Sequence, residues 1–175
     1  MIPYFYNLNT FLFSESLIEE VSNLVENRLD SIIAYKGKDD VFDGNNYYYG
    51  NDLKEISEIK SFKKKCSLEC FPVIMVHKPN SSVIKHVDDP NKRNTVIITP
   101  LSSILNFSPT YFWNNKEDTD PVVTCNFSKN MSVLFNTQKM HSLINDSDEY
   151  RISLQICFNE DFETILNLYQ NGKLI

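Results

Sequence analysis

The chain has 175 residues and a formal net charge of −6 at pH 7, with 42% hydrophobic and 23% charged residues. This composition is ordinary for a globular protein, and the length suits a single domain, residues 1–175, with one sizeable core. The acidic balance disfavours binding to nucleic acid or anionic membrane through a broad basic surface, because such binding requires clustered Lys and Arg.

The N-terminus and the cysteines indicate the compartment. The first residues lack the positive charge and the long apolar run of a signal peptide, and no apolar stretch is long enough to span a membrane. None of the four cysteines forms a Cys-x-x-Cys pair, so reduced thiols are expected. The sequence therefore predicts a cytoplasmic protein without a membrane segment.

The first 70 residues are predicted to form a helical support region. Residues 14–29 fit an amphipathic helix, because apolar side chains recur at spacings of three and four. A second helix is predicted over residues 52–63. The polar and aromatic segment between them, residues 35–50, is predicted to be a long loop with room for a short strand. Its part at 44–50 could serve as a lid or a peptide groove.

After residue 70 the pattern changes to short strands separated by turn residues. Eight such runs with no helix between them predict a double-stranded β-helix (jelly roll, cupin-like) core over 71–158. The chain is thus expected to be mainly β with flanking helices. A last helix is predicted over 161–170, within a C-terminal segment of residues 159–175. The predicted strands are 71–77, 82–88, 94–100, 110–114, 121–127, 131–136, 139–145 and 149–158.

The last predicted strand has two chemically different faces. Tyr150, Ile152, Leu154, Ile156 and Phe158 alternate with Arg151, Ser153, Gln155 and Cys157. Because successive side chains on a strand point to opposite faces, the apolar set is expected to meet the core beneath the helices. The other set, which includes Arg151, is then expected to point into the mouth of the barrel.

Two histidines and one aspartate are candidates for a metal site. In His86-x-Asp88 the two side chains share one face of a strand, and His141 follows after enough residues for the chain to return beside it. Two imidazoles and one carboxylate form a facial ligand set for Fe(II) and leave the opposite face of the metal open. The alternative is a structural histidine in the core with a turn at Asp88-Asp89-Pro90.

Arg151 follows His141 by ten residues, and on an inward face it requires an anionic partner. A guanidinium can grip a carboxylate with two parallel hydrogen bonds. The partner is either a co-substrate or a structural Asp or Glu.

Residues 77–158, about half of the chain, resemble the 2-oxoglutarate/Fe(II)-dependent dioxygenase superfamily. The segment His86–Leu101 is similar to small members, some of them phage-encoded. The segments Ser132–Asn136, His141–Asn145 and Arg151–Leu154 are similar to the aspartyl/asparaginyl hydroxylase and cis-proline hydroxylase branch.

The resemblance implies roles for individual residues. The catalytic residues would be the Fe(II) ligands His86, Asp88 and His141. Arg151 would pair with the distal carboxylate of 2-oxoglutarate, and Ser153 would hydrogen-bond the same group. The roles of His77 and of the pair Thr95 and Asn94 have alternatives. His77 stands where many relatives carry a co-substrate-binding Tyr, and is either such a ligand or a buried structural histidine. Thr95 and Asn94 are candidates to line the pocket.

The implied activity is that of an oxidoreductase which consumes O2 and 2-oxoglutarate and releases succinate and CO2, most often with hydroxylation of the substrate. A free amino acid or an amino-acid side chain in a protein is the expected substrate, and nucleic acid is not expected. Arg93 is a candidate to hold a substrate carboxylate, and Tyr111 and Trp113 are candidates to wall the pocket. The alternative function is a non-catalytic, cupin-like metal- or ligand-binding protein, which needs no co-substrate clamp at Arg151 and Ser153.

Overall fold

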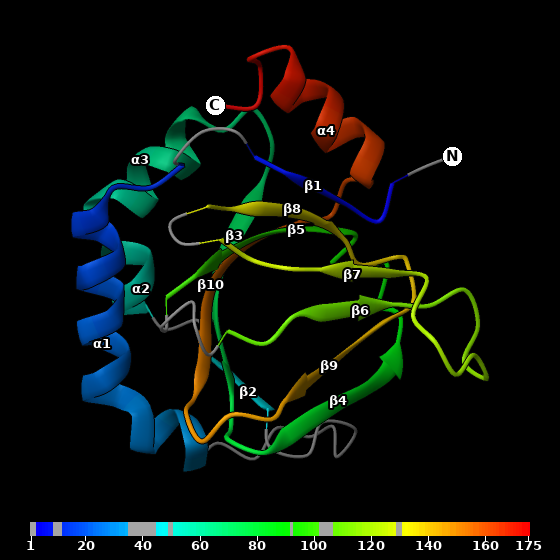
Figure 1. The fold of residues 1–175 in the computed structure, drawn as a ribbon. Helices are drawn as coiled ribbons and strands as arrows, with labels where there is room; N and C mark the ends of the chain where they lie inside the picture. The colour runs from blue at the N-terminus through cyan, green and yellow to red at the C-terminus, as the bar shows by residue number, and fades with distance from the viewer. Residues whose placement is uncertain are drawn as a thin grey trace.

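The computed structural model describes residues 3–8, 12–34, 45–48, 51–91, 93–101, 107–128 and 131–175. Two antiparallel sheets face each other and form the body of the molecule (Figure 1). The larger sheet has the order β1-β8-β5-β10-β3-β2, and the smaller has the order β4-β9-β6-β7. Strands distant in sequence are therefore neighbours, as in a jelly roll. The strands are β1 (Phe5–Asn7), β2 (Asn45–Tyr48), β3 (Cys70–His77), β4 (Ser81–His86), β5 (Thr95–Pro100), β6 (Thr110–Phe112), β7 (Val123–Cys125), β8 (Val133–Asn136), β9 (His141–Asn145) and β10 (Arg151–Phe158).

Each of the eight predicted strands overlaps a strand of the structure, and two further strands come from the N-terminal region. β1 pairs with β8, and β2 pairs with β3, so both edge strands of the larger sheet precede residue 70. The predicted loop at 35–50 contains β2. The lid or peptide groove considered for residues 44–50 otherwise lies outside the described residues.

The predicted helices are all present, but the first extends to Ala34, beyond the predicted end at residue 29, and the second is interrupted. They are α1 (Glu15–Ala34), α2 (Asn51–Glu55), α3 (Ser57–Lys65) and α4 (Phe162–Gln170). The single helix predicted over 52–63 is interrupted at Ile56, whose ψ of 125° is not helical. At the start of α4 the Asp161 side chain accepts a hydrogen bond from the Thr164 main-chain N–H at 2.9 Å. Gly172 follows α4 with φ of 63°, a conformation open to glycine at no steric cost.

Two apolar clusters lie on the two faces of the larger sheet. The first joins the helices to the outer face of the sheet and contains Leu154, Ile156 and Phe158 from β10. The second lies between the two sheets and contains Cys157 from the same strand. The predicted alternation along β10 is therefore confirmed: the apolar set packs beneath the helices, and the other set faces the space between the sheets.

Two findings concern membranes and disulfides. Within the part of the chain that the structure describes, no helix is both long enough and apolar enough to cross a membrane. Cys66, Cys70, Cys125 and Cys157 are free thiols, as predicted.

Replacing Ile156 with Ala is expected to lower the free energy of unfolding by about 2–5 kcal/mol. Ile156 is 0% exposed within the first cluster, so the substitution leaves a cavity beneath the helices. Ile144→Ala is the matched control, because Ile144 also lies on a strand but is 53% exposed. Urea unfolding of both variants measures the difference, and equal stabilities would contradict this account of the core.

Candidate metal and co-substrate site

Three candidate ligands converge at one end of the smaller sheet. His86 ends β4 and His141 begins β9, and the two residues are direct partners across the antiparallel pair. Their ring centroids are 4.3 Å apart. Asp88 follows β4, and its Oδ1 lies 3.3 Å from His86 Nε2. One ligand atom from each residue lies within 4.8 Å of the other two, so a single ion can contact all three.

Main-chain carbonyls orient both imidazoles. His86 Nδ1 lies 2.8 Å from the Ile84 carbonyl oxygen, and His141 Nδ1 lies 2.8 Å from the Lys139 carbonyl oxygen. Because a carbonyl can only accept, Nδ1 carries a proton in both rings, and Nε2 faces the other ligands. Without a proton Nε2 can bind a metal, and with one the Nε2 of His86 can donate to Asp88. Burial lowers the pKa of His141 to about 4, so this ring is neutral at physiological pH, as a metal ligand must be.

Asp88 is ionised despite its surroundings. Burial opposes the charged carboxylate, but the hydrogen bond from His86 and the positive charge of Arg93 outweigh it and hold the pKa of Asp88 at about 2. Its second oxygen, Oδ2, is buried, makes no hydrogen bond and lies 3.5 Å from Arg93 Nε. The charged Asp88 carboxylate and the two imidazoles, with their ligand atoms within 4.8 Å of one another, fit a divalent metal with nitrogen and oxygen ligands.

Arg151 is a buried cation that no carboxylate of the described residues neutralises. Its side chain is 1% exposed, and no ion pair with Asp or Glu involves it among the described residues. Nε donates to the Ser108 carbonyl oxygen at 3.0 Å, and the guanidinium carbon lies 3.9 Å from the ring centroid of Phe107 and 5.3 Å from that of Phe127. Burial lowers its pKa to about 9. Since burial of a charge without its counterion is costly, the geometry favours an anionic ligand here.

His77 is the neighbour of Arg151 in the larger sheet. The two residues are direct partners between β3 and β10, so their side chains emerge on the same face. His77 is buried, and burial together with the charge of Arg151 holds its pKa well below the ordinary value. A neutral imidazole beside a buried guanidinium can donate one further hydrogen bond to an anion.

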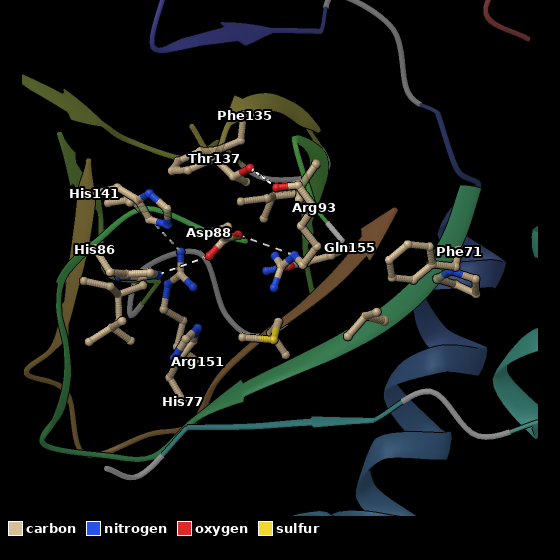
Figure 2. Close-up of a pocket in the computed structure, with 18 of the residues that line it drawn as sticks. Phe71, His77, His86, Asp88, Arg93, Phe135, Thr137, His141, Arg151 and Gln155 are labelled. Atoms are coloured by element: carbon tan, nitrogen blue, oxygen red, sulfur yellow. Dashed lines mark hydrogen bonds and ion pairs between the residues drawn. The ribbon is translucent and has the colours of Figure 1, made fainter. Parts of the chain in front are cut away.

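These groups line one cavity of about 800 Å³ between the sheets (Figure 2). Of the residues predicted from the sequence, six lie on its wall: the three candidate metal ligands, Arg151, His77 and Arg93. Five do not: Ser153, Thr95, Asn94, Tyr111 and Trp113.

The five outlying residues have other partners. Asn94 donates from its side-chain amide to the Asn159 carbonyl oxygen. Ser153 is fully buried, and its hydroxyl accepts a hydrogen bond from Gln155 Nε2 at 3.4 Å. Thr95 donates from its hydroxyl to the Glu160 carbonyl oxygen at 2.9 Å. Trp113 donates from Nε1 to Ser142 Oγ at 2.8 Å and carries the Lys85 ammonium 3.7 Å above its ring. Tyr111 is the cross-strand partner of Ser142 on the same sheet. None of them is brought to the cavity.

Arg93 reaches the cavity but is engaged with protein groups. Its Nε faces Asp88, and a terminal nitrogen donates to Gln155 Oε1 at 2.6 Å. Gln155 also lines the cavity, and its inward direction follows from the alternation along β10. Thr110, whose hydroxyl lies 3.4 Å from an Arg151 terminal nitrogen, carries no comparable signal in the sequence.

No protein-family model matches the chain, and neither does any curated protein. Solved structures do match. A prolyl hydroxylase from Trichoplax adhaerens, in complex with a hypoxia inducible factor peptide fragment, has a TM-score of 0.63 and 15% identity, covering 93% of this chain and 86% of that one. The viral collagen prolyl hydroxylase of Paramecium Bursaria Chlorella virus-1 has a TM-score of 0.57 and 13% identity, and the match covers 89% of this chain and 95% of that one. EvdO2 from Micromonospora carbonacea var. aurantiaca, complexed with 2-oxoglutarate, has a TM-score of 0.60 and 17% identity, and the match covers 89% of this chain and 85% of that one. The predicted double-stranded β-helix fold is therefore confirmed.

Proposed function

We propose that the protein is an Fe(II)- and 2-oxoglutarate-dependent oxygenase. One observation carries the proposal: a facial set of two imidazoles and one carboxylate shares a cavity with a buried arginine that has no carboxylate partner among the described residues. A metal-binding protein of cupin type needs the first feature but has no use for the second. The fold is also that of the 2-oxoglutarate-binding EvdO2.

Three side chains are proposed as the metal ligands. His86, Asp88 and His141 would hold Fe(II) on one face, with the imidazoles fixed by the carbonyls of Ile84 and Lys139. When bound, the metal with 2-oxoglutarate and O2 would supply the oxidation of a substrate C–H bond, with succinate and CO2 as products.

The co-substrate would be held by the neighbouring strands β3 and β10. Arg151 would receive its distal carboxylate in a charge-assisted pair, with His77 as an additional donor. The apolar rings of Phe107 and Phe127 fix the guanidinium plane and keep water away from it. Ser153 would act indirectly, since its hydroxyl meets Gln155.

Hydroxylation of an amino acid or of an amino-acid side chain in a protein is the reaction that we propose. Two of the structural neighbours are prolyl hydroxylases, and one of them holds a peptide. The cavity of about 800 Å³ lies within the range of pockets that enclose whole ligands, and leaves room beside a five-carbon co-substrate.

Anaerobic reconstitution tests the proposal. Fe(II) followed by 2-oxoglutarate is expected to produce the weak visible charge-transfer band of the chelate, and His141→Ala is expected to abolish it. Ile144→Ala, on the same strand but exposed, is the control that should keep the band. Iron binding without the band would instead identify a non-catalytic metal-binding jelly roll, and the role given to Arg151 would be abandoned.

A further inference from the structure

The described residues that line the cavity carry a net charge opposite in sign to the charge of the whole molecule. Among the described residues that line it, Lys54, Arg93 and Arg151 are cations, and Asp88 is the one carboxylate. Leaving the imidazoles aside, three positive charges against one negative charge leave an excess of two. The chain as a whole carries −6. Because a cavity with low-dielectric walls concentrates the field of its lining charges, this excess acts on whatever enters it.

The proposed metal and co-substrate do not remove this excess. Fe(II) carries two positive charges and 2-oxoglutarate two negative ones, so the pair adds no net charge. With Arg151 assigned to the co-substrate, the remaining cations are Arg93 and, at the exposed rim, Lys54. The inference below rests on the proposed function through this step.

Arg93 occupies a different part of the cavity from Arg151. In Figure 2 it lies with Gln155 between Asp88 and Phe71, whereas Arg151 and His77 lie below the metal ligands. Its guanidinium is held from two sides, by Asp88 Oδ2 at 3.5 Å and by Gln155 Oε1 at 2.6 Å, and its side chain stays 25% exposed. A guanidinium presents its N–H groups in a planar fork that matches the geometry of a carboxylate.

An apolar wall adjoins this second cation. Alternate residues of β3 face the cavity from His77 outward, namely Met75, Val73 and Phe71. Phe71 marks the end of the cavity away from the metal ligands in Figure 2. Beyond the metal, a ligand therefore meets apolar surface on one side and positive charge on the other.

We infer that the substrate is a carboxylate-bearing molecule whose apolar part lies against Phe71, Val73 and Met75 and whose anionic group pairs with Arg93, with Lys54 at the mouth. A cationic substrate, such as a lysyl or arginyl side chain, would meet the excess positive charge and is disfavoured. The carboxylate can belong to a free acid or to an acidic side chain beside the oxidised residue of a peptide.

Matched probe pairs that differ only in charge test the inference. The protein is loaded anaerobically with Mn²⁺ and 2-oxoglutarate, and paramagnetic broadening of the probe NMR signals reports binding next to the metal. The first pair is N-acetylproline and N-acetylprolinamide. The second is the capped dipeptides acetyl-Glu-Pro-amide and acetyl-Gln-Pro-amide. The acidic member of at least one pair is expected to bind about tenfold more tightly or better, the value of one charge-assisted hydrogen bond.

The outcomes separate the inference from the function on which it rests. Preference for the acid in the first pair identifies a free carboxylate, and in the second pair an acidic side chain. Lys54→Met should reduce the preference, whereas Lys173→Met, which removes an exposed cation outside the cavity, should not. Equal broadening within both pairs, or none, in protein that has bound Mn²⁺ and 2-oxoglutarate overturns the inference. Failure to bind Mn²⁺ and 2-oxoglutarate overturns the proposed function instead.

Discussion

Asp88→Asn is expected to lower the affinity for Fe(II) by at least about 100-fold, because loss even of a residue that supports a metal ligand costs 10- to 100-fold. The side chain keeps its shape but loses the negative charge that faces both imidazoles. In the parent protein this charge is present at all physiological pH values, since the pKa of Asp88 is held at about 2. Anaerobic equilibrium dialysis against Fe(II) measures the change.

A surface substitution of the same kind is the control. Asp146→Asn removes one carboxylate from the exposed turn between β9 and β10 and should leave iron affinity unchanged. Circular dichroism of Asp88→Asn should show a folded protein. If folded Asp88→Asn binds iron as the parent does, the assignment of the three metal ligands is wrong.

Arg151→Met is expected to weaken 2-oxoglutarate binding by roughly 30-fold to several thousand-fold, while Fe(II) binding persists. The estimate follows from the loss of about 2–5 kcal/mol when one member of a buried, hydrogen-bonded charge pair is truncated. The effect is large because the guanidinium is 1% exposed and has no carboxylate among the described residues to which its charge is already committed. Titration of the charge-transfer band with 2-oxoglutarate measures the affinity.

Arg151→Met is expected to weaken co-substrate binding without lowering the stability of the protein that has no co-substrate bound. Without co-substrate, Arg151 is a buried charge whose desolvation is not repaid by an anion, so Arg151→Met should unfold at the same temperature as the parent or a higher one. Saturating 2-oxoglutarate should raise the midpoint of the iron-loaded parent but not that of the variant. Arg28→Met, which removes an exposed guanidinium paired with Asp52, is the control and should behave as the parent in the titration. An unchanged affinity in Arg151→Met would refute the clamp.

Local rules predicted the parts of the site that lie on regular strands. On β10 a period of two places Arg151 and Gln155 toward the cavity and Leu154 and Ile156 beneath the helices, because successive side chains on a strand point to opposite faces. The direct pairing of His86 with His141 was not visible in the sequence, but the scarcity of histidine made both candidates for one site: the chain has three.

The residues that were predicted to line the cavity but lie elsewhere share a cause: their positions depend on contacts with distant strands. Thr95 precedes Val96 on β5, and only the cross-strand packing decides which of the two faces inward. Trp113 is drawn to the Ser142 hydroxyl and the Lys85 ammonium, partners from two other strands. Nor do β1 and β2 have a strong local signal, since each is short and gains its stability from a neighbour far along the chain.

By itself, the sequence determined the period of each element, the two faces of β10 and the residue types able to hold a metal and a carboxylate, because these depend on neighbours within a few residues. Only the tertiary structure decided that Arg151 has no carboxylate partner in the described part of the chain, that His77 stands beside it and that Arg93 bridges Asp88 and Gln155. Those facts depend on which strands lie side by side, and strand order is set by burial of the whole sheet rather than by any local pattern.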